Sequence, residues 1–194
     1  MIGSWTTILD NSLKELRTQY FMDERAIINE DDLKYKVRQF IEKASNEVND
    51  ILVKPEVPWY DKNAAELKPK FYFDLTVFRN SIFELRLRDQ AMRRKGYYYN
   101  DNSLAIMLKF VKPAFNFSEI SNDIEKLKVF ADETEEQANL HKPILIIGIT
   151  DDHLYKQTEE KIVSSLKGYE NNYLSRLTIF YFNQTKFVRL DCGQ

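Results

Sequence analysis

Two charged residues stand inside apolar, strand-like runs and are the first candidates for chemistry. Asp74 lies in "FYFDLTVF" and Lys109 lies in "SLAIMLKFVKP". A buried unpaired charge is costly, so these residues are expected to pair with each other or to serve a polar site. Carboxylates are hard ligands for Mg²⁺, and an ammonium group can stabilise developing negative charge. Three interpretations are open: a structural ion pair, a lysine that reaches solvent at a strand end, and a catalytic pocket.

The elements that would position these residues follow from hydrophobic periodicity. One helix is predicted over Ser4 to Tyr20, and a second follows Asn29 with apolar residues at helical spacing as far as Ile51. Asn29 is a suitable N-cap, and the acidic residues that begin with Glu30 suit the positive end of a helix dipole. The stretch Pro55 to Lys70 holds three prolines, which is typical of a connector.

Three strands are predicted after this connector. They span Phe71 to Phe78, Ser81 to Asp89 and Ser103 to Val111. In the first, strict alternation would place Asp74 on one face and the apolar residues on the other; these are Phe71, Phe73, Leu75 and Val77. The three strands together can form an antiparallel meander.

The second half of the chain alternates helices with strands. A helix is predicted from the capping-box pair Asn116 and Glu119 to about Leu140. A buried central strand, "PILIIGIT", leads to a helix that Thr150 or one of the following aspartates caps, and "RLTIFYFN" and "KFVRLD" close the chain as strands.

This element order predicts an α/β protein with a three-layer mixed sheet and flanking helices. Residues 1–28 are predicted to be an N-terminal helical extension, and residues 29–194 to be the α/β domain.

Over about residues 29–150 the chain resembles the PD-(D/E)XK, or restriction-endonuclease-like, superfamily of nucleases. The core of that family is a helix, three antiparallel strands, a helix and a further strand. Its signature is an acid on the second core strand and (D/E)-x-K on the third. The resemblance implies that Asp74 and Glu30 bind Mg²⁺, that Lys109 orients water or stabilises charge, and that the partner is nucleic acid.

The chain departs from this signature two residues before Lys109, where Met107 stands in place of the acid. A thioether is a poor ligand for Mg²⁺, so weak metal binding is expected. Glu84 is a further candidate for a relocated metal ligand. The segment "SNDIEKL" also resembles a D-x-x-K-L pattern of some family members, although Asp123 and Lys126 have the spacing of a surface ion pair.

We therefore expect a nuclease-like, nucleic-acid-associated domain with a degenerate metal site and weak or no phosphodiesterase activity. The alternatives are an active Mg²⁺-dependent endonuclease with a relocated carboxylate, and a non-catalytic module that binds a protein partner.

A basic segment followed by tyrosines is the candidate nucleic-acid interface. Its basic residues are Arg86, Arg88, Arg93, Arg94 and Lys95. Such a segment offers phosphate contacts and stacking surfaces, although a solvated hairpin extension is the alternative. The net charge of −2 gives no global positive field, so nucleic-acid binding would have to use a local patch of this kind.

Composition excludes several other classes of protein. The five glycines form neither a GxGxxG nor a P-loop motif, and one cysteine, Cys192, excludes an internal disulfide framework. No apolar run is long enough to cross a bilayer, so the expected location is the cytoplasm, without a membrane partner.

Overall fold

The computed structural model describes residues 2–22, 27–45, 51–60, 69–79, 102–137, 139–167 and 176–192. The helices are α1 (Ile2–Met22), α2 (Glu30–Ser45), α4 (Ser118–Glu133) and α5 (Asp152–Leu166), with a 3₁₀ turn, η1, at Glu135–Gln137. The strands are β1 (Ile51–Tyr60), β2 (Pro69–Arg79), β3 (Ser103–Val111), β4 (His141–Ile149), β5 (Thr178–Phe182) and β6 (Phe187–Asp191).

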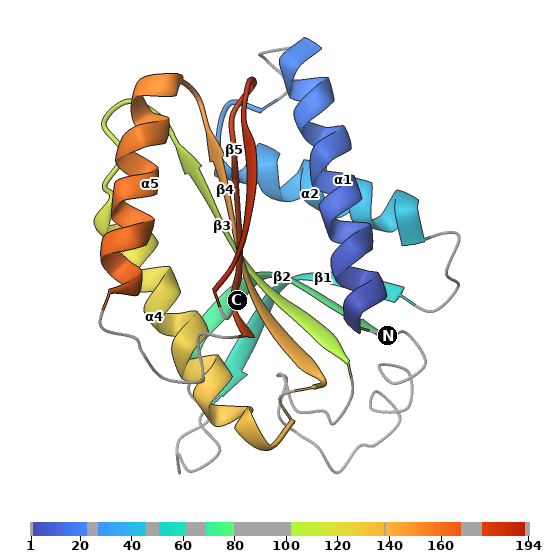
Figure 1. Ribbon diagram of the computed structural model, residues 1–194. Coiled ribbons are helices and arrows are strands. Elements are labelled where there is room, and N and C mark those ends of the chain that lie inside the picture. The colour runs from blue at the N-terminus through green and yellow to red at the C-terminus, as the bar shows by residue number, and fades with distance from the viewer. Residues whose placement is uncertain are drawn as a thin grey trace.

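The strands form one mixed sheet in the order β1-β2-β3-β4-β5-β6. The pairs β1–β2, β2–β3 and β5–β6 are antiparallel, whereas β3, β4 and β5 run parallel. Helices α1 and α2 cover one face of the sheet, and α4 and α5 cover the other (Figure 1). The α/β class and the mixed sheet with flanking helices are therefore as predicted.

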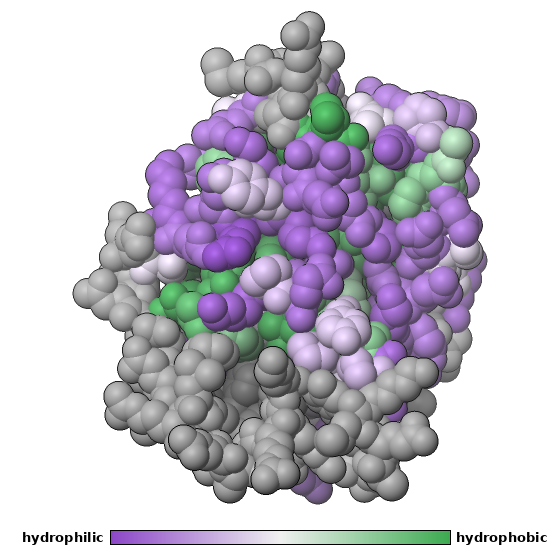
Figure 2. All heavy atoms as spheres, turned by 180° about the vertical axis from the view of Figure 1, so that it is seen from behind, coloured by the Kyte–Doolittle hydropathy of each residue, from purple (hydrophilic) through white to green (hydrophobic). Residues whose placement is uncertain are grey.

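The centre of the sheet is apolar on both faces. Every residue of β3 and all but Lys142 of β4 are buried, which the continuous apolar runs predict. Even-numbered residues of β3 pack toward α1 and α2, and odd-numbered residues pack toward α4 and α5. From behind, hydrophilic side chains dominate the described surface, with smaller hydrophobic patches between them (Figure 2). None of the described helices is long and apolar enough to span a membrane.

Strand β1 corrects two sequence predictions. Ile51 begins this strand and does not extend the preceding helix, and Pro55 and Pro58 lie within the strand and not in a connector. Among the described strands, β1 pairs only with β2, at the edge of the sheet. Because proline cannot donate a ladder hydrogen bond, an edge strand is the position where it is tolerated.

The ribbon of β1 and β2 bends halfway along its length. Phe73 packs in the cluster under α4, whereas Leu75 packs in the cluster under α1 and α2. The prediction that both share one face of a regular strand is wrong. The pairing passes from Pro55–Leu75 to Val57–Phe73, and Glu56 between them adopts a φ of 51°, in the left-handed region. Asp74 therefore lies at the bend.

Strand β2 stays beside β3 for only four residue pairs, from Phe78–Ser103 to Leu75–Ile106. Beyond Ile106, β3 pairs with β4 as far as Val111 and with no other strand of the described residues. The sheet is therefore forked between β2 and β3. The strand predicted over Ser81 to Asp89 lies outside the described residues.

The remaining helix predictions are partly confirmed. Asp151 caps α5, since its Oδ1 accepts a hydrogen bond from the Leu154 N–H at 2.9 Å. Helix α4 ends at Glu133, earlier than the predicted Leu140. Its predicted capping box does not form, because the Asn116 side chain accepts from the N–H of Ser118 and not from that of Glu119.

Candidate functional site

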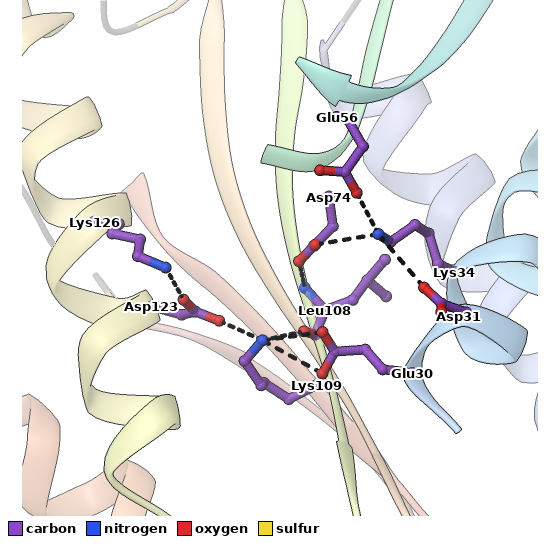
Figure 3. Close-up of polar contacts among 9 residues, drawn as sticks. All are labelled: Glu30, Asp31, Lys34, Glu56, Asp74, Leu108, Lys109, Asp123 and Lys126. Carbon is purple, nitrogen blue, oxygen red and sulfur yellow. Dashed lines mark hydrogen bonds and ion pairs between the residues drawn. The ribbon is translucent and has the colours of Figure 1, made fainter. Parts of the chain in front are cut away.

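Asp74 occupies the fork of the sheet with its side chain directed at the backbone of β3. Its Oδ2 accepts a hydrogen bond from the Leu108 N–H at 2.7 Å (Figure 3). The carboxylate thus replaces the strand partner that β3 loses where β2 bends away. This replacement explains why an aspartate stands in an aromatic strand, because a buried backbone N–H needs an acceptor.

Lys109 joins the two helical layers at the same fork. Its Nζ lies 3.2 Å from Glu30 Oε1 on α2 and 3.1 Å from Asp123 Oδ2 on α4, and it donates to the Leu108 carbonyl at 3.0 Å. Only 11% of its side chain is exposed. Burial alone would lower the pKa of Lys109, but the facing carboxylates of Asp123 and Glu30 raise it above its ordinary value.

Asp123 is a site residue that its spacing to Lys126 did not reveal. The predicted ion pair with Lys126 forms, but Asp123 is not at the surface, since its side chain is only 3% exposed. Its Oδ1 accepts from Lys126 at 2.7 Å, whereas Oδ2 has the Lys109 ion pair but no contact of hydrogen-bond geometry. The D-x-x-K-L pattern is the sequence signal that singles it out. Its helical spacing from Ile120 and Leu127 also places it on the buried side of α4.

Lys34 and Glu56 complete the cluster, and the sequence predictions include neither. Lys34 Nζ lies 3.6 Å from Asp74 Oδ1 and donates a short hydrogen bond to Glu56 Oε1. It also lies 3.9 Å from Asp31 Oδ1. The available signal for Lys34 was its spacing, four residues after Glu30 on the same helical face. Glu56 had no such signal, because its strand reads as a connector.

The predicted residues Asp74, Lys109 and Glu30 therefore lie in one charged cluster, but not with the predicted pairing. In the described part of the chain, the ion pairs join Asp74 to Lys34, and Lys109 to Glu30 and Asp123. A direct Asp74–Lys109 ion pair is absent among these described residues. The backbone of Leu108 lies between them, since its N–H binds Asp74 and its carbonyl binds Lys109.

Burial raises the pKa of two of the predicted carboxylate ligands, Glu30 and Asp74. It raises the pKa of Glu30, against the lowering effect of Lys109. Burial also raises the pKa of Asp74, although the Leu108 N–H, Lys109 and Lys34 act to lower it. The fork is partly shielded from water, since the side chains of Lys109 and Asp123 are 11% and 3% exposed.

The carboxylates of Glu30, Asp74 and Asp123 are hard oxygen donors of the kind that Mg²⁺ prefers. Asp123 Oδ2 is buried and faces the Lys109 ammonium group at 3.1 Å, so this oxygen already has a cationic partner. As they stand, however, no three His, Cys, Asp or Glu side chains among the described residues are arranged to hold one ion. Lys109 provides a physical reason, because its ammonium group lies between Glu30 and Asp123.

Met107 does not contribute to this polar cluster. It is 2% exposed and packs in the apolar cluster under α4. Glu84 and the basic residues Arg86, Arg88, Arg93, Arg94 and Lys95 lie outside the described residues, so their roles stay predictions.

Comparisons with protein-family models, with curated proteins and with solved structures found no match to this chain. The function is therefore argued from the geometry of the fork and from the chemistry of its side chains.

Proposed function

We propose that this protein is a restriction-endonuclease-like, nucleic-acid-associated domain with weak, metal-dependent phosphodiesterase activity. One observation carries the proposal: Glu30, Asp74 and Asp123 converge with Lys109 at a fork in the sheet. Four different elements supply these side chains. Asp74 satisfies the Leu108 N–H, but that role does not require the additional buried charges of Lys109 and Asp123, which favour a functional site.

The order of elements supports the same proposal. Helix α2, the meander β1-β2-β3, helix α4 and the parallel strand β4 follow one another in the order that the family resemblance implies. Asp74 then lies on the second strand of the meander and Lys109 on the third, which are the positions of the signature acid and lysine.

Asp123 is the best replacement for the acid that is missing at position 107. Met107 and Lys109 have the same parity on β3, and the Met107 side chain packs toward α4, the helix that carries Asp123. An acid from α4 therefore approaches the side of β3 from which an acid at position 107 would project. This is the relocated-carboxylate alternative, with Asp123 in the role that the sequence offered to Glu84 or Glu30.

In this proposal Glu30, Asp74 and Asp123 are the residues that would hold Mg²⁺. The bound ion would polarise the phosphodiester and lower the pKa of water. Lys109 would then be free to stabilise negative charge on the phosphate. Hydrolysis adds water across one P–O bond, which leaves a phosphate monoester on one fragment and a hydroxyl group on the other. Activity is expected to be weak, because metal binding must separate Lys109 from Glu30 and Asp123.

A second candidate function is a silent nuclease-like domain that binds nucleic acid or protein without cleavage. The ion pairs of Lys109 favour it, because the ammonium group already pairs with two of the three carboxylates. In that case Met107 marks the loss of the metal site.

A nicking assay on plasmid and single-stranded substrates with Mg²⁺ or Mn²⁺ separates the two functions. We expect slow cleavage by the wild-type protein and a loss of about 100-fold in Asp74→Asn and in Lys109→Ala. Asp132→Asn on α4 is the matched control, since Asp132 also has a buried oxygen without a hydrogen-bond partner. Cleavage that survives both site substitutions would contradict the proposal, and no cleavage by the wild type would favour the silent domain.

A further inference from the structure

Lys109 and Lys34 differ in how exposed their carboxylate partners are. Lys109 faces Asp123, which is 3% exposed, and Glu30, which is 37% exposed. Lys34 faces Glu56, which is 58% exposed, Asp31, which is 92% exposed, and Asp74, which is 18% exposed. Ion pairs with exposed partners are weak, because water competes for both charges. Two of the three partners of Lys34 are therefore weak, and Asp74 keeps its hydrogen bond from the Leu108 N–H when Lys34 leaves, whereas Asp123 would stay buried if Lys109 left.

Lys34 is also in the right place to meet a ligand at the fork. It follows Glu30 by one helical turn, so α2 presents both side chains on the same face. Its Nζ is 3.6 Å from the Asp74 carboxylate and contacts Glu56 at the bend of the β1–β2 ribbon (Figure 3). Its side chain retains 19% exposure.

We propose that Lys34 is a phosphate-binding residue for a nucleic-acid substrate, held at the fork by Glu56 and Asp74 until the substrate arrives. This inference rests on the proposed function. A lysine binds phosphate as a mobile point charge, and its flexible stem lets it move from carboxylate to phosphate. Asp74 is then relieved of a competing cation when the phosphate draws Lys34 away.

This role predicts effects of opposite sign on two ligands from one substitution. Loss of the Lys34 charge removes a phosphate contact, so nucleic acid binds more weakly. The same loss removes a positive charge beside Asp74, so a divalent cation binds more tightly. The substitution leaves the other charged groups of the fork in place. These are Glu30, Asp31, Glu56, Lys109, Asp123 and Lys126. A purely structural role for Lys34 would weaken both kinds of binding together.

The test measures binding of fluorescently labelled DNA, single-stranded and duplex, by anisotropy over a range of salt concentrations. Ca²⁺ replaces Mg²⁺ to limit cleavage, and calorimetry with Mn²⁺ gives the metal affinity. In Lys34→Met we expect DNA binding to weaken about threefold to tenfold, with a salt slope smaller by about one. We expect Mn²⁺ to bind about threefold more tightly.

Three further variants sharpen the test. Lys34→Arg keeps the charge and should bind DNA within about twofold of the wild type. Glu56→Gln releases Lys34 and should strengthen DNA binding. Lys36→Met removes the same charge from α2 outside the cluster of Figure 3 and should leave the Mn²⁺ affinity unchanged.

The possible outcomes separate this inference from the proposed function. DNA binding by the wild type with an unchanged salt slope in Lys34→Met would overturn the role of Lys34 alone. Weaker binding of both DNA and Mn²⁺ in Lys34→Met would also overturn it. No DNA binding by the wild-type protein would overturn both the phosphate role and the nucleic-acid function.

Discussion

The two sides of strand β3 show how this sheet makes room for chemistry. On its β4 side, β3 pairs continuously over nine residues, from Ser103 to Val111, and all of these residues and their partners except Lys142 are buried. On its β2 side the pairing stops after four residues, at Ile106, and the next backbone N–H on that side belongs to Leu108. Asp74 binds that N–H, and charged side chains gather around it. The polar cluster therefore lies where β3 has no neighbouring strand among the described residues.

The largest expected effect comes from placing an acid on the apolar side of this strand. Met107→Glu should destabilise the metal-free protein by about 3 to 4 kcal/mol, because a charge replaces a side chain that is 2% exposed. With Mn²⁺ present, the added ligand should raise the melting temperature more than in the wild type. Thermal unfolding with and without Mn²⁺ measures both. A metal response equal to that of the wild type would show that position 107 does not reach the cation.

Loss of the central lysine ranks next. Lys109→Met should destabilise the protein by about 3 kcal/mol, because Asp123 would stay buried with only Lys126 as its partner. Lys34→Met is the matched substitution, and it should cost only about 1 kcal/mol, because Glu56 is exposed and Asp74 keeps the Leu108 N–H as a partner. Urea denaturation of the two variants measures the difference. Equal costs would contradict the distinction between the partners of the two lysines.

The acceptor for the free β3 backbone is expected to matter less. Asp74→Ala should cost about 2 kcal/mol, because the Leu108 N–H would lose its hydrogen bond. Asp74→Asn keeps a carbonyl acceptor and should cost less. Hydrogen exchange at the Leu108 amide reports on this directly: protection should fall in the alanine variant and persist in the asparagine variant. Unchanged protection in Asp74→Ala would show that another group satisfies this amide.

How far the sequence predicts this fold depends on whether each signal is local. Continuous apolar runs predict β3 and β4, and Asp151 predicts the start of α5, because these features depend on neighbouring residues. Strand β1 was not predicted, because Pro55 and Pro58 suggest a connector unless the strand is known to lie at the edge of the sheet. The bend at Asp74 was not predicted, because the residue with the left-handed backbone is Glu56, whereas a glycine would have indicated such a conformation.

The same distinction between local signals and tertiary structure applies to the candidate site. Asp74, Lys109 and Glu30 could be singled out because each is a charge at a position that the family resemblance names. Their partners could not be predicted, because the pairing depends on the fork and on the packing of α2 and α4. The spacing of Asp123 and Lys126 suggested a surface pair, although the helical spacing of Asp123 from Ile120 and Leu127 is a signal for the burial that the tertiary structure shows.

The smallest expected effect is the pH dependence that Asp74 contributes to stability. Burial raises the pKa of Asp74 above its ordinary value of 3.8, so the Asp74 carboxyl group binds its proton more tightly in the folded protein than in the unfolded chain. The stabilisation from this group is complete below pH 3.8 and is lost as the pH rises through the folded pKa. The free energy of unfolding of the wild type should therefore fall, relative to Asp74→Asn, as the pH rises from 3.8 toward neutrality. A difference between the two that is constant over this range would contradict the shift.

The central claim is that Asp123 supplies a metal ligand at the fork, and calorimetric titration with Mn²⁺ tests it most directly. The proposal predicts weak binding by the wild-type protein, a loss of at least about tenfold in affinity in Asp123→Asn, and no change in Asp132→Asn. Asp132 lies about 13 Å farther along the same helix, so it controls for the loss of one carboxylate from α4. Mn²⁺ binding that is equal in the wild type and Asp123→Asn, or no binding by the folded wild-type protein, would contradict the claim.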